Sequence, residues 1–436
     1  MSQDTKLNKE ILRLAIPNIL SNVSVPLLSS VDTALMGHES VKHLGAVGIG
    51  AMIFNFLYWN FGFLRMGTTG FTAQAFGAKD KTEVISTLFR ALFLSVLIAL
   101  ILILAAPLIG AVATKLMFVQ DNQLDLVLSY FSIRILAAPA SLILFAMFGW
   151  FFGMQNSVYP LFITISLNIT NIIVSYFLVK ELGWGIEGVA WGTVIAQYTG
   201  LLFALGLFVF KYRKRLGDLN ISALKRLDKV ISFLRINGDI FIRTFCLTFV
   251  FGFFYAQSSK MQANMLEINT ILMQFLNWMS YGVDGFAYAA ESLVGKYLGA
   301  NNQARLKLAV RQSFKWGMGF AVLYALVYGI FGESLLYVFT SEAWLVDASM
   351  VYLFWMFILP LAGTPCYIWD GVFVGLAASK DMRNGMILSL AVFMIVYFLV
   401  KNSLGNHGLW LALCTFLLVR AVILWWYYRR GNFQRV

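Results

Sequence analysis

The sequence predicts an all-α polytopic membrane protein with twelve transmembrane helices, arranged as two parallel-repeat six-helix lobes around a central cavity. Of the 436 residues, 60% are hydrophobic and only 12% are charged, a balance that soluble domains do not reach. At about 20 residues for each span, this composition has room for roughly twelve spans. The 35 glycines and 7 prolines fit closely packed helices. A β-barrel is excluded because the sequence lacks the short alternating segments of barrel strands.

Twelve apolar runs, separated by polar or glycine-rich breaks, supply the predicted spans. Six lie in the first half, at residues 10–36, 46–76, 86–113, 129–152, 159–180 and 186–210. A basic stretch follows at 211–235, and six more runs lie at residues 237–258, 268–298, 310–339, 349–375, 384–402 and 406–428. We therefore expect an amino-terminal lobe at 1–210, a basic cytoplasmic linker at 211–236 and a carboxy-terminal lobe at 237–436.

Local matches at a nearly constant offset indicate that the lobes are duplicated halves. The string FFGMQNS at 151–157 matches FVGLAAS at 373–379, and GAKD at 77–80 matches GANN at 299–302, both at an offset of 222. Matches at offsets of 220 and 221 pair Gly185 with Gly405, Gly188 with Gly408 and Pro139 with Pro360. Because each half has an even number of spans, the repeats are expected to be parallel, with the substrate site in a cavity between them.

The distribution of basic residues predicts how the chain lies in the membrane. If the loops alternate between two sides, 24 of the 33 lysines and arginines fall on the side of the amino terminus and five on the other side. Basic residues accumulate on the cytoplasmic side, so we expect an inner (plasma) membrane protein with both termini in the cytoplasm. The net charge of +12 is then explained by orientation signals, and neither a nucleic-acid partner nor a lipid-headgroup site in the linker is needed.

The sequence contains no motif of a catalytic, metal or nucleotide site. Cys246, Cys366 and Cys414 each sit in an apolar run and are expected to be small packing residues, without a disulfide or metal role. No HExxH, CxxC, GxSxG or phosphate-binding loop occurs. We therefore expect no enzyme activity, no cofactor and no resident metal.

An acid in the first span is the leading candidate for a coupling residue. A carboxylate at mid-bilayer costs about 2.5 to 3.5 kcal/mol, so it needs a reason to be there. Asp32 follows Pro26, which leaves the carbonyl of Asn22 without its helical donor, and Pro17 is a second helix-bending position. A desolvated carboxyl titrates closer to neutral pH, as proton coupling requires. The alternative is a structural carboxyl satisfied by neighbouring serines and asparagines.

Other polar residues inside the predicted spans fall into two groups. Asn171 and Thr193 have side-chain oxygens that could hydrogen-bond to Asp32 or bind an ion together with it. Taken alone, each of these residues more often forms a hydrogen bond between helices. Asp239 and Arg243, spaced i, i+4, are expected to form a structural ion pair.

The acids of the second half have two open interpretations. Asp284, Tyr288 and Glu291 form one polar stripe on the eighth span, and Asp370 in the tenth adds a further acid to the same lobe. Their charge would suit a cationic substrate or a second protonation site. Pairing with Arg420 or Lys296 explains them equally well.

Several strings resemble the multidrug and toxic compound extrusion (MATE) family, specifically its DinF-like branch. They are VDTALMGH at 31–38, LRMGTTGFTAQAFGA at 64–78, NGDIFIRTFCL at 237–247, DGFAYAAESLVGKYLGA at 284–300 and WDGVFVG at 369–375. The resemblance spans essentially the whole chain. It implies a cation-coupled antiporter that exports amphipathic, often cationic, compounds by alternating access.

The resemblance also implies roles for individual residues. The family's first-helix acid matches Asp32, its fifth-helix asparagine matches Asn171, and its sixth-helix threonine matches Thr193. The family's fifth-helix acid is replaced here by Ser175. One carboxylate would then have to balance a bound sodium ion alone, so we expect coupling to protons, with sodium as the less favoured ion.

The sequence leaves two other classes of function open. A flippase for a lipid-linked precursor would line its cavity with several cations for the phosphates, and Arg65, Arg134, Arg243 and Arg420 are the deep candidates. The second class is a membrane receptor or scaffold that does not transport. Such a protein would not need duplicated lobes or acids that are energetically costly inside the membrane. The expected partners are small amphipathic or cationic substrates and the lipid bilayer, and the expected state is a monomer.

Overall fold

The computed structural model describes residues 3–37, 41–261, 264–431 and 433. Within this part, the side chains of residues 3, 25–34, 37, 41, 42 and 44 are not described. The described chain forms helices and contains no strand. The all-helical expectation from composition is therefore confirmed for these residues.

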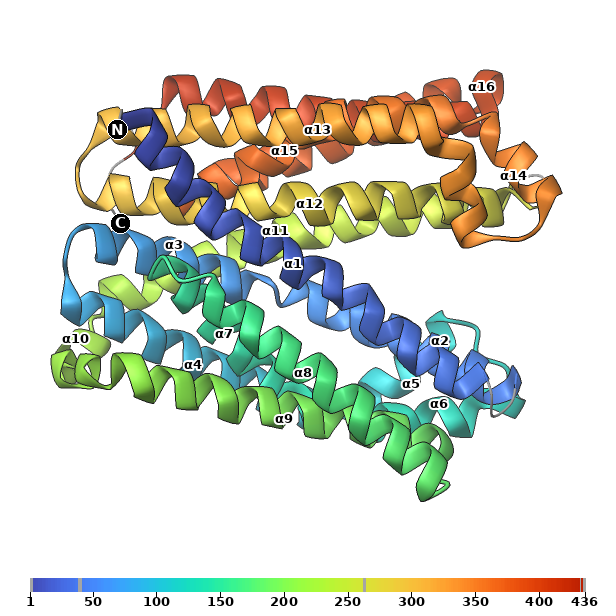
Figure 1. The fold of residues 1–436 in the computed structure, drawn as a ribbon, viewed down its shortest axis with the longest axis horizontal. Helices are drawn as coiled ribbons and strands as arrows, with labels where there is room; N and C mark the ends of the chain where they lie inside the picture. The colour runs from blue at the N-terminus through green and yellow to red at the C-terminus, as the bar shows by residue number, and fades with distance from the viewer. Residues whose placement is uncertain (1–2, 38–40, 262–263, 432, 434–436) are drawn as a thin grey trace. The chain divides into compact units, whose positions relative to one another are not determined.

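The helices follow one another along the whole chain (Figure 1). In the first half they are α1 (Gln3–Gly37), α2 (Val41–Asn60), α3 (Phe63–Gly77), α4 (Lys81–Leu104), α5 (Ala106–Leu116), α6 (Asp121–Arg134), α7 (Ala138–Gly153), α8 (Val158–Tyr176), α9 (Gly185–Tyr212) and α10 (Ile221–Leu224). In the second half they are α11 (Leu227–Ser258), α12 (Met265–Gly299), α13 (Gln303–Phe339), α14 (Ala343–Met350), α15 (Leu353–Gly375) and α16 (Ser379–Arg430). Short 3-10 or π turns lie at Ile135–Ala137, Phe177–Glu181 and Arg213–Asp218.

The predicted spans can be traced in these helices. Nine helical stretches in the described residues are long and apolar enough to cross a membrane. One of them, α16, is bent at Gly405, where φ is 51°, and supplies the two predicted spans on either side of that glycine. The predicted first and eighth spans fall in α1 and α12, which lie outside those nine. Together these helices account for the twelve spans of the polytopic fold.

The chain forms two compact units, Leu20–Phe233 and Met1–Ile19 with Leu234–Val436. The expected amino-terminal lobe comprises residues 1–210, and the start of α1 differs from that expectation. The reason is packing: Gly285 on α12 brings its helix so close to α1 that a Cβ there would meet the Ala15 carbonyl oxygen at 2.9 Å. Asn8 also accepts a hydrogen bond of 3.1 Å from the Trp316 indole. One helix thus contributes residues to both units.

The internal repeat is visible in the backbone. Non-glycine residues with positive φ recur at the same offset as the repeated strings, Lys79 (59°) with Asn301 (53°) and Gln155 (61°) with Ala377 (54°). The helix caps repeat too: Asp80 accepts from the backbone N–H of Glu83, and Asn302 accepts from that of Arg305, each at 3.0 Å. L-residues rarely adopt this conformation, so its recurrence at the sequence offset supports a duplicated six-helix unit.

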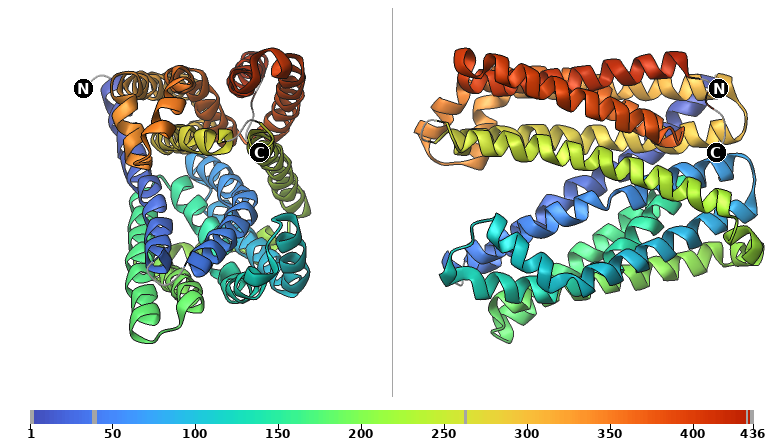
Figure 2. Two further views of the ribbon diagram at one scale, coloured as in Figure 1. Left: turned by 90° about the vertical axis from the view of Figure 1, so that its right-hand side faces the viewer. Right: turned by 180° about the vertical axis from the view of Figure 1, so that it is seen from behind.

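Packing in the first unit centres on a fully buried indole. The Trp150 ring on α7 donates from Nε1 to the Val84 carbonyl on α4 at 2.9 Å and packs edge-on against Phe208 and Tyr212 of α9. In the other unit, α12 packs against α13 and α15, and α15 also packs against α16 (Figure 2).

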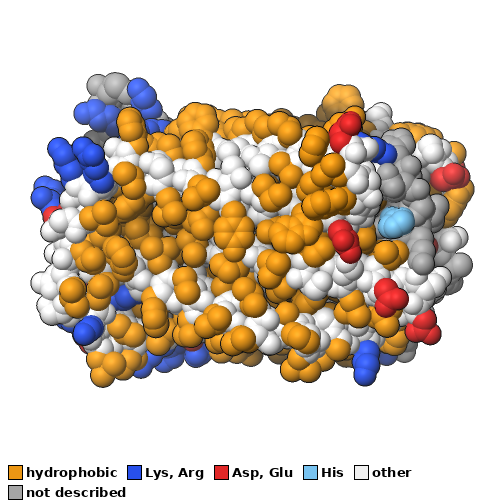
Figure 3. Space-filling model, turned by 90° about the horizontal axis from the view of Figure 1, so that it is seen from below, with side chains coloured by type: hydrophobic (Ala, Val, Ile, Leu, Met, Phe, Trp, Pro, Cys, Tyr) orange, Lys and Arg blue, Asp and Glu red, His pale blue; other side chains and the backbone are white. Residues whose placement is uncertain are grey.

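On the face drawn in Figure 3, hydrophobic side chains form a broad band. Lysines and arginines gather mainly at one end of the band and acids mainly at the other. This distribution is typical of helices that cross a bilayer.

Candidate functional site

The polar residues predicted for the fifth and sixth spans meet between α8 and α9. The side-chain amide of Asn171 donates to Thr193 Oγ1 at 3.0 Å, and that hydroxyl donates to the Val189 carbonyl at 3.2 Å. Ser175, one turn further along α8, is also fully buried. The helices approach closely here because Gly192 faces Ser175, whose Cα a methyl group on Gly192 would meet at 2.9 Å.

Two atoms of this cluster have no hydrogen-bond partner in the described part of the chain. They are Asn171 Oδ1 and Ser175 Oγ, both enclosed by protein. A buried polar atom without a partner costs about 1 to 3 kcal/mol, so such atoms are unusual in a native structure. The cluster therefore offers an acceptor and a hydroxyl to a group that approaches from a neighbouring helix.

The neighbouring helix is α1. Ser21 on α1 donates to Thr164 Oγ1 on α8 at 3.0 Å, and the Asn168 amide on α8 donates to the Ser24 carbonyl at 3.1 Å. Both contacts advance in the same direction along the two helices, so α1 and α8 run parallel at this point. Asp32 and Ser175 each come eleven residues after the first of these contacts.

Of the three α1 residues with a predicted role, Pro17, Pro26 and Asp32, only Pro17 has a described side chain. Asp32 and Pro26 lie outside the described side chains, so their predicted roles stay predictions. Pro17 is half-buried, and α1 is helical on both sides of it. It lies two residues before the point where α1 passes from one compact unit to the other.

The predicted ion pair between Asp239 and Arg243 is wrong. The Asp239 carboxylate is bound by Arg383 at 2.5 Å and by the Ser379 hydroxyl at 2.8 Å, both on the first turns of α16. Arg243 instead reaches Asp370 on α15. The i, i+4 spacing places both side chains on one face of α11, but two different neighbouring helices supply their partners.

Asp370 is held between two arginines inside the carboxy-terminal unit. It accepts from Arg243 of α11 and from Arg420 of α16, and all three side chains are buried. Pairing with Arg420 was one of the two open interpretations of this acid. One carboxylate and two guanidinium groups leave a net positive charge. In the described residues, Arg243 Nε and Arg420 Nε and Nη1 have no hydrogen-bond partner.

The polar stripe of α12 lies beside this cluster in the same unit. Asp284 and Tyr288 are half-buried, and Glu291 is buried. The close approach of α15 to α12 depends on Gly371 and Gly375, where a Cβ would meet backbone oxygens of Ala287 and Glu291. Lys296, the other proposed partner of these acids, instead pairs with Glu10 at 3.0 Å.

One buried network, centred on Asn269, was not predicted from the sequence. The Asn269 amide of α12 exchanges hydrogen bonds of 2.7 and 3.0 Å with Asn406, donates to Ser258 at 2.7 Å and accepts from the Trp410 indole at 2.9 Å. These residues join α11, α12 and the second half of α16. The available signal was an asparagine at the start of an apolar span, which does not identify a partner so distant in the sequence.

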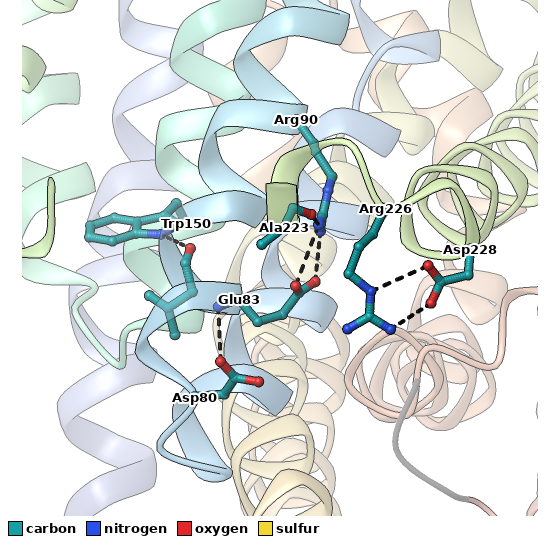
Figure 4. A network of polar contacts seen from close by, with 8 residues as sticks. Asp80, Glu83, Arg90, Trp150, Ala223, Arg226 and Asp228 are labelled. Atoms are coloured by element: carbon teal, nitrogen blue, oxygen red, sulfur yellow. Dashed lines mark hydrogen bonds and ion pairs between the residues drawn. The ribbon is translucent and has the colours of Figure 1, made fainter. Parts of the chain in front are cut away.

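The linker between the units is fixed to α4 (Figure 4). Arg90 on α4 pairs with Glu83 at 2.7 Å and donates to the Ala223 carbonyl of α10 at 2.6 Å. Further along, Arg226 pairs with Asp228 at 2.9 Å. This hydrogen bond and the charge of Asp228 raise the pKa of the exposed Arg226 guanidinium.

In the described residues, no group of three or more His, Cys, Asp or Glu side chains could hold a metal ion. Cys246, Cys366 and Cys414 are buried and free.

Comparisons with known proteins agree with this architecture. The MatE family model matches the chain twice, at residues 17–177 and 240–401, one match in each half. The chain is 36% identical to DNA damage-inducible protein F of Escherichia coli K12, over 98% of this chain and 93% of that protein. It is 24% identical to the probable multidrug resistance protein NorM of Thermotoga maritima, over 99% and 94%.

Two solved structures show the same fold. An outward-facing multidrug resistance MATE family transporter superposes with a TM-score of 0.88 at 18% identity, covering 99% of this chain and 98% of that one. The Vibrio cholerae MATE transporter VcmN in its bent form gives 0.86 at 19% identity, covering 99% and 98%.

Proposed function

Because the chain belongs to the MatE family of membrane efflux transporters, we propose that it exports amphipathic, cationic small molecules in exchange for protons by alternating access. The proposal places the protein in the inner membrane with both termini in the cytoplasm. Asp32 is the proton-accepting residue of this proposal, and Asn171, Ser175 and Thr193 are its hydrogen-bonding neighbours.

The observation that carries the proposal is the buried cluster with two unpartnered atoms between α8 and α9. Asp32 and Ser175 each come eleven residues after the contact of Ser21 with Thr164, which supports the first-helix acid as the group that would use these atoms. Among the described side chains, the cluster contains no carboxylate. A sodium ion prefers several oxygen ligands that include enough negative charge, whereas a single desolvated carboxyl needs only a proton.

In the proposed mechanism, protonation of Asp32 neutralises it and changes its hydrogen bonds to the cluster. A carboxylate accepts only, whereas a protonated carboxyl also donates, so Asn171 Oδ1 gains a donor when the proton binds. Because α1 contributes to both units and carries Pro17 and Pro26, a change in its bend is a means of coupling proton binding to substrate release.

The decisive experiment reconstitutes the protein in proteoliposomes and measures efflux of a fluorescent cationic dye under separately imposed proton and sodium gradients. We expect proton-driven efflux by the wild type and at least a tenfold loss in Asp32→Asn. Asp121→Asn, which removes an exposed acid, serves as the matched control and should transport normally. Full proton-driven transport by Asp32→Asn would overturn the role of Asp32. Sodium-driven transport at clamped pH would overturn proton coupling.

Asp284, Tyr288, Glu291 and Asp370 were predicted as a possible substrate or second-lobe site. The first three remain a proposed second contact for a cation. For Asp370 the two bound arginines favour a structural role, because the cluster is net positive. The same contacts weaken the flippase alternative. Two of its four deep arginines, Arg243 and Arg420, already bind the carboxylate of Asp370.

A further inference from the structure

A groove in the carboxy-terminal unit lies where α15 packs between α13 and the second half of α16. Its volume is about 1390 Å³. Trp369 of α15 forms its base and contacts a ring on each wall, Phe314 of α13 at 4.8 Å and Tyr428 of α16 at 4.9 Å between ring centroids. These contacts fix which parts of the two walls face each other.

Each wall presents one stripe of side chains. On α13 the lining residues recur at three- and four-residue spacing from Gln303 to Phe314, and on α16 they do so from Leu418 to Arg429. Phe314 and Tyr428 both contact Trp369, so they lie at the same height along the groove. Residues before Phe314 on α13 and after Tyr428 on α16 therefore belong to one end of the groove. Leu418 and Val422 belong to the other end.

The two ends differ in chemistry. Lys307, Arg311 and Arg429 line the end where α13 begins and α16 finishes, whereas the other end is apolar. The groove lining in the described residues contains three cations and no carboxylate. Lys307 and Arg311 are exposed and form no ion pair there, and Arg429 lies over the Trp425 ring at 4.2 Å. A basic end that continues into an apolar one matches an amphiphile with an anionic head.

We propose that this groove binds an anionic phospholipid from the surrounding bilayer. The phosphate contacts Lys307, Arg311 and Arg429, and the acyl chains lie along Trp425, Val422 and Leu418. Each arginine or lysine near an anionic lipid surface strengthens binding by about fivefold. Tryptophan and tyrosine rings are enriched at the membrane–water interface, where the lipid headgroups lie. The site is separate from the residues assigned to transport, so the proposal stands whether or not the proposed function does.

The test is lipid retention by the purified full-length protein. The protein is incubated with equal amounts of phosphatidylglycerol and phosphatidylcholine carrying the same acyl chains, and the bound lipid is counted by native mass spectrometry. We expect the wild type to prefer phosphatidylglycerol by about tenfold or more. The variant Lys307→Gln/Arg311→Gln/Arg429→Gln is expected to lose that preference and to keep its unfolding temperature, because the replaced side chains are exposed.

A matched control removes the same charge outside the groove. The variant Lys315→Gln/Lys380→Gln/Arg430→Gln includes an arginine stacked on a tryptophan in the same way, Arg430 over Trp426 at 4.1 Å, and should retain the preference. Glycerol 3-phosphate, which lacks acyl chains, should not displace the lipid. The proposal is overturned if the groove variant keeps the preference, if the control loses it equally, or if glycerol 3-phosphate competes as well as the lipid does.

Discussion

At the scale of single residues, Asp370 shows how a buried charge can organise a membrane protein without being the site of chemistry. It receives Arg243 and Arg420 from two other helices, so three helices of one unit share one carboxylate. Buried charges are expensive unless they are paired, and removing one partner typically costs about 3 to 5 kcal/mol. Which partner is removed decides the net charge that remains on the other side chains.

This argument predicts unequal effects of two conservative substitutions. Asp370→Asn removes the carboxylate that binds both guanidinium groups, whereas Arg420→Gln leaves the neutral pair of Asp370 with Arg243. We expect Asp370→Asn to destabilise the protein by about 3 to 5 kcal/mol and Arg420→Gln by clearly less. Thermal unfolding in detergent measures both. Equal losses would argue against a net positive cluster, and the double variant should be more stable than Asp370→Asn alone.

Some side-chain contacts could be predicted from the sequence and others could not. The contact of Asn171 with Thr193 joins two residues that the sequence analysis singled out together, and the pairing of Asp370 with Arg420 was one of its two alternatives. The pair of Asp239 with Arg243 was wrong because helical spacing identifies a shared face but not the helix opposite it. The Asn269 network could not be predicted for the same reason.

At the scale of elements, close helix contacts depend on a few glycines. In the described structure, Gly192 has no room for a methyl group against Ser175, whereas Gly206, on the same helix α9, has no neighbour within 4 Å of such a group. The two glycines therefore have opposite roles in stability. One allows the helices to approach, and the other only weakens its own helix.

Substituting alanine at Gly192 and at Gly206 tests these opposite roles, with Gly206 as the control. Gly192→Ala should separate α8 from α9, lower the unfolding temperature by several degrees and reduce proton-driven dye efflux, because the cluster of Asn171 and Ser175 is disturbed. Gly206→Ala should leave transport unchanged and raise helix stability by about 0.5 to 1 kcal/mol. A normal unfolding temperature in Gly192→Ala would mean that the helices can readjust at no cost.

At the scale of the whole molecule, the duplicated architecture was the most predictable feature. Apolar runs of span length and repeated strings are local properties of the sequence, and the positive-φ residues and the two family matches recur at nearly the same offset. The assignment of the first part of α1 to the carboxy-terminal unit was not predictable. It depends on the packing of Ala15 against Gly285, which lie in opposite halves of the sequence.

The predicted orientation can be tested at exposed lysines of the linker and of the carboxy-terminal lobe. Exposed lysines at 225 and 380 are expected on the cytoplasmic side, and those at 260 and 401 on the other side, because basic residues accumulate in the cytoplasm. Single cysteines at these positions, in a chain without its three native cysteines, can be labelled with a membrane-impermeant maleimide. In intact cells only Lys260→Cys and Lys401→Cys should react, and Lys225→Cys and Lys380→Cys should react after permeabilisation. The reverse pattern would invert the topology, and a mixed pattern would contradict the expected alternation of loops between the two sides.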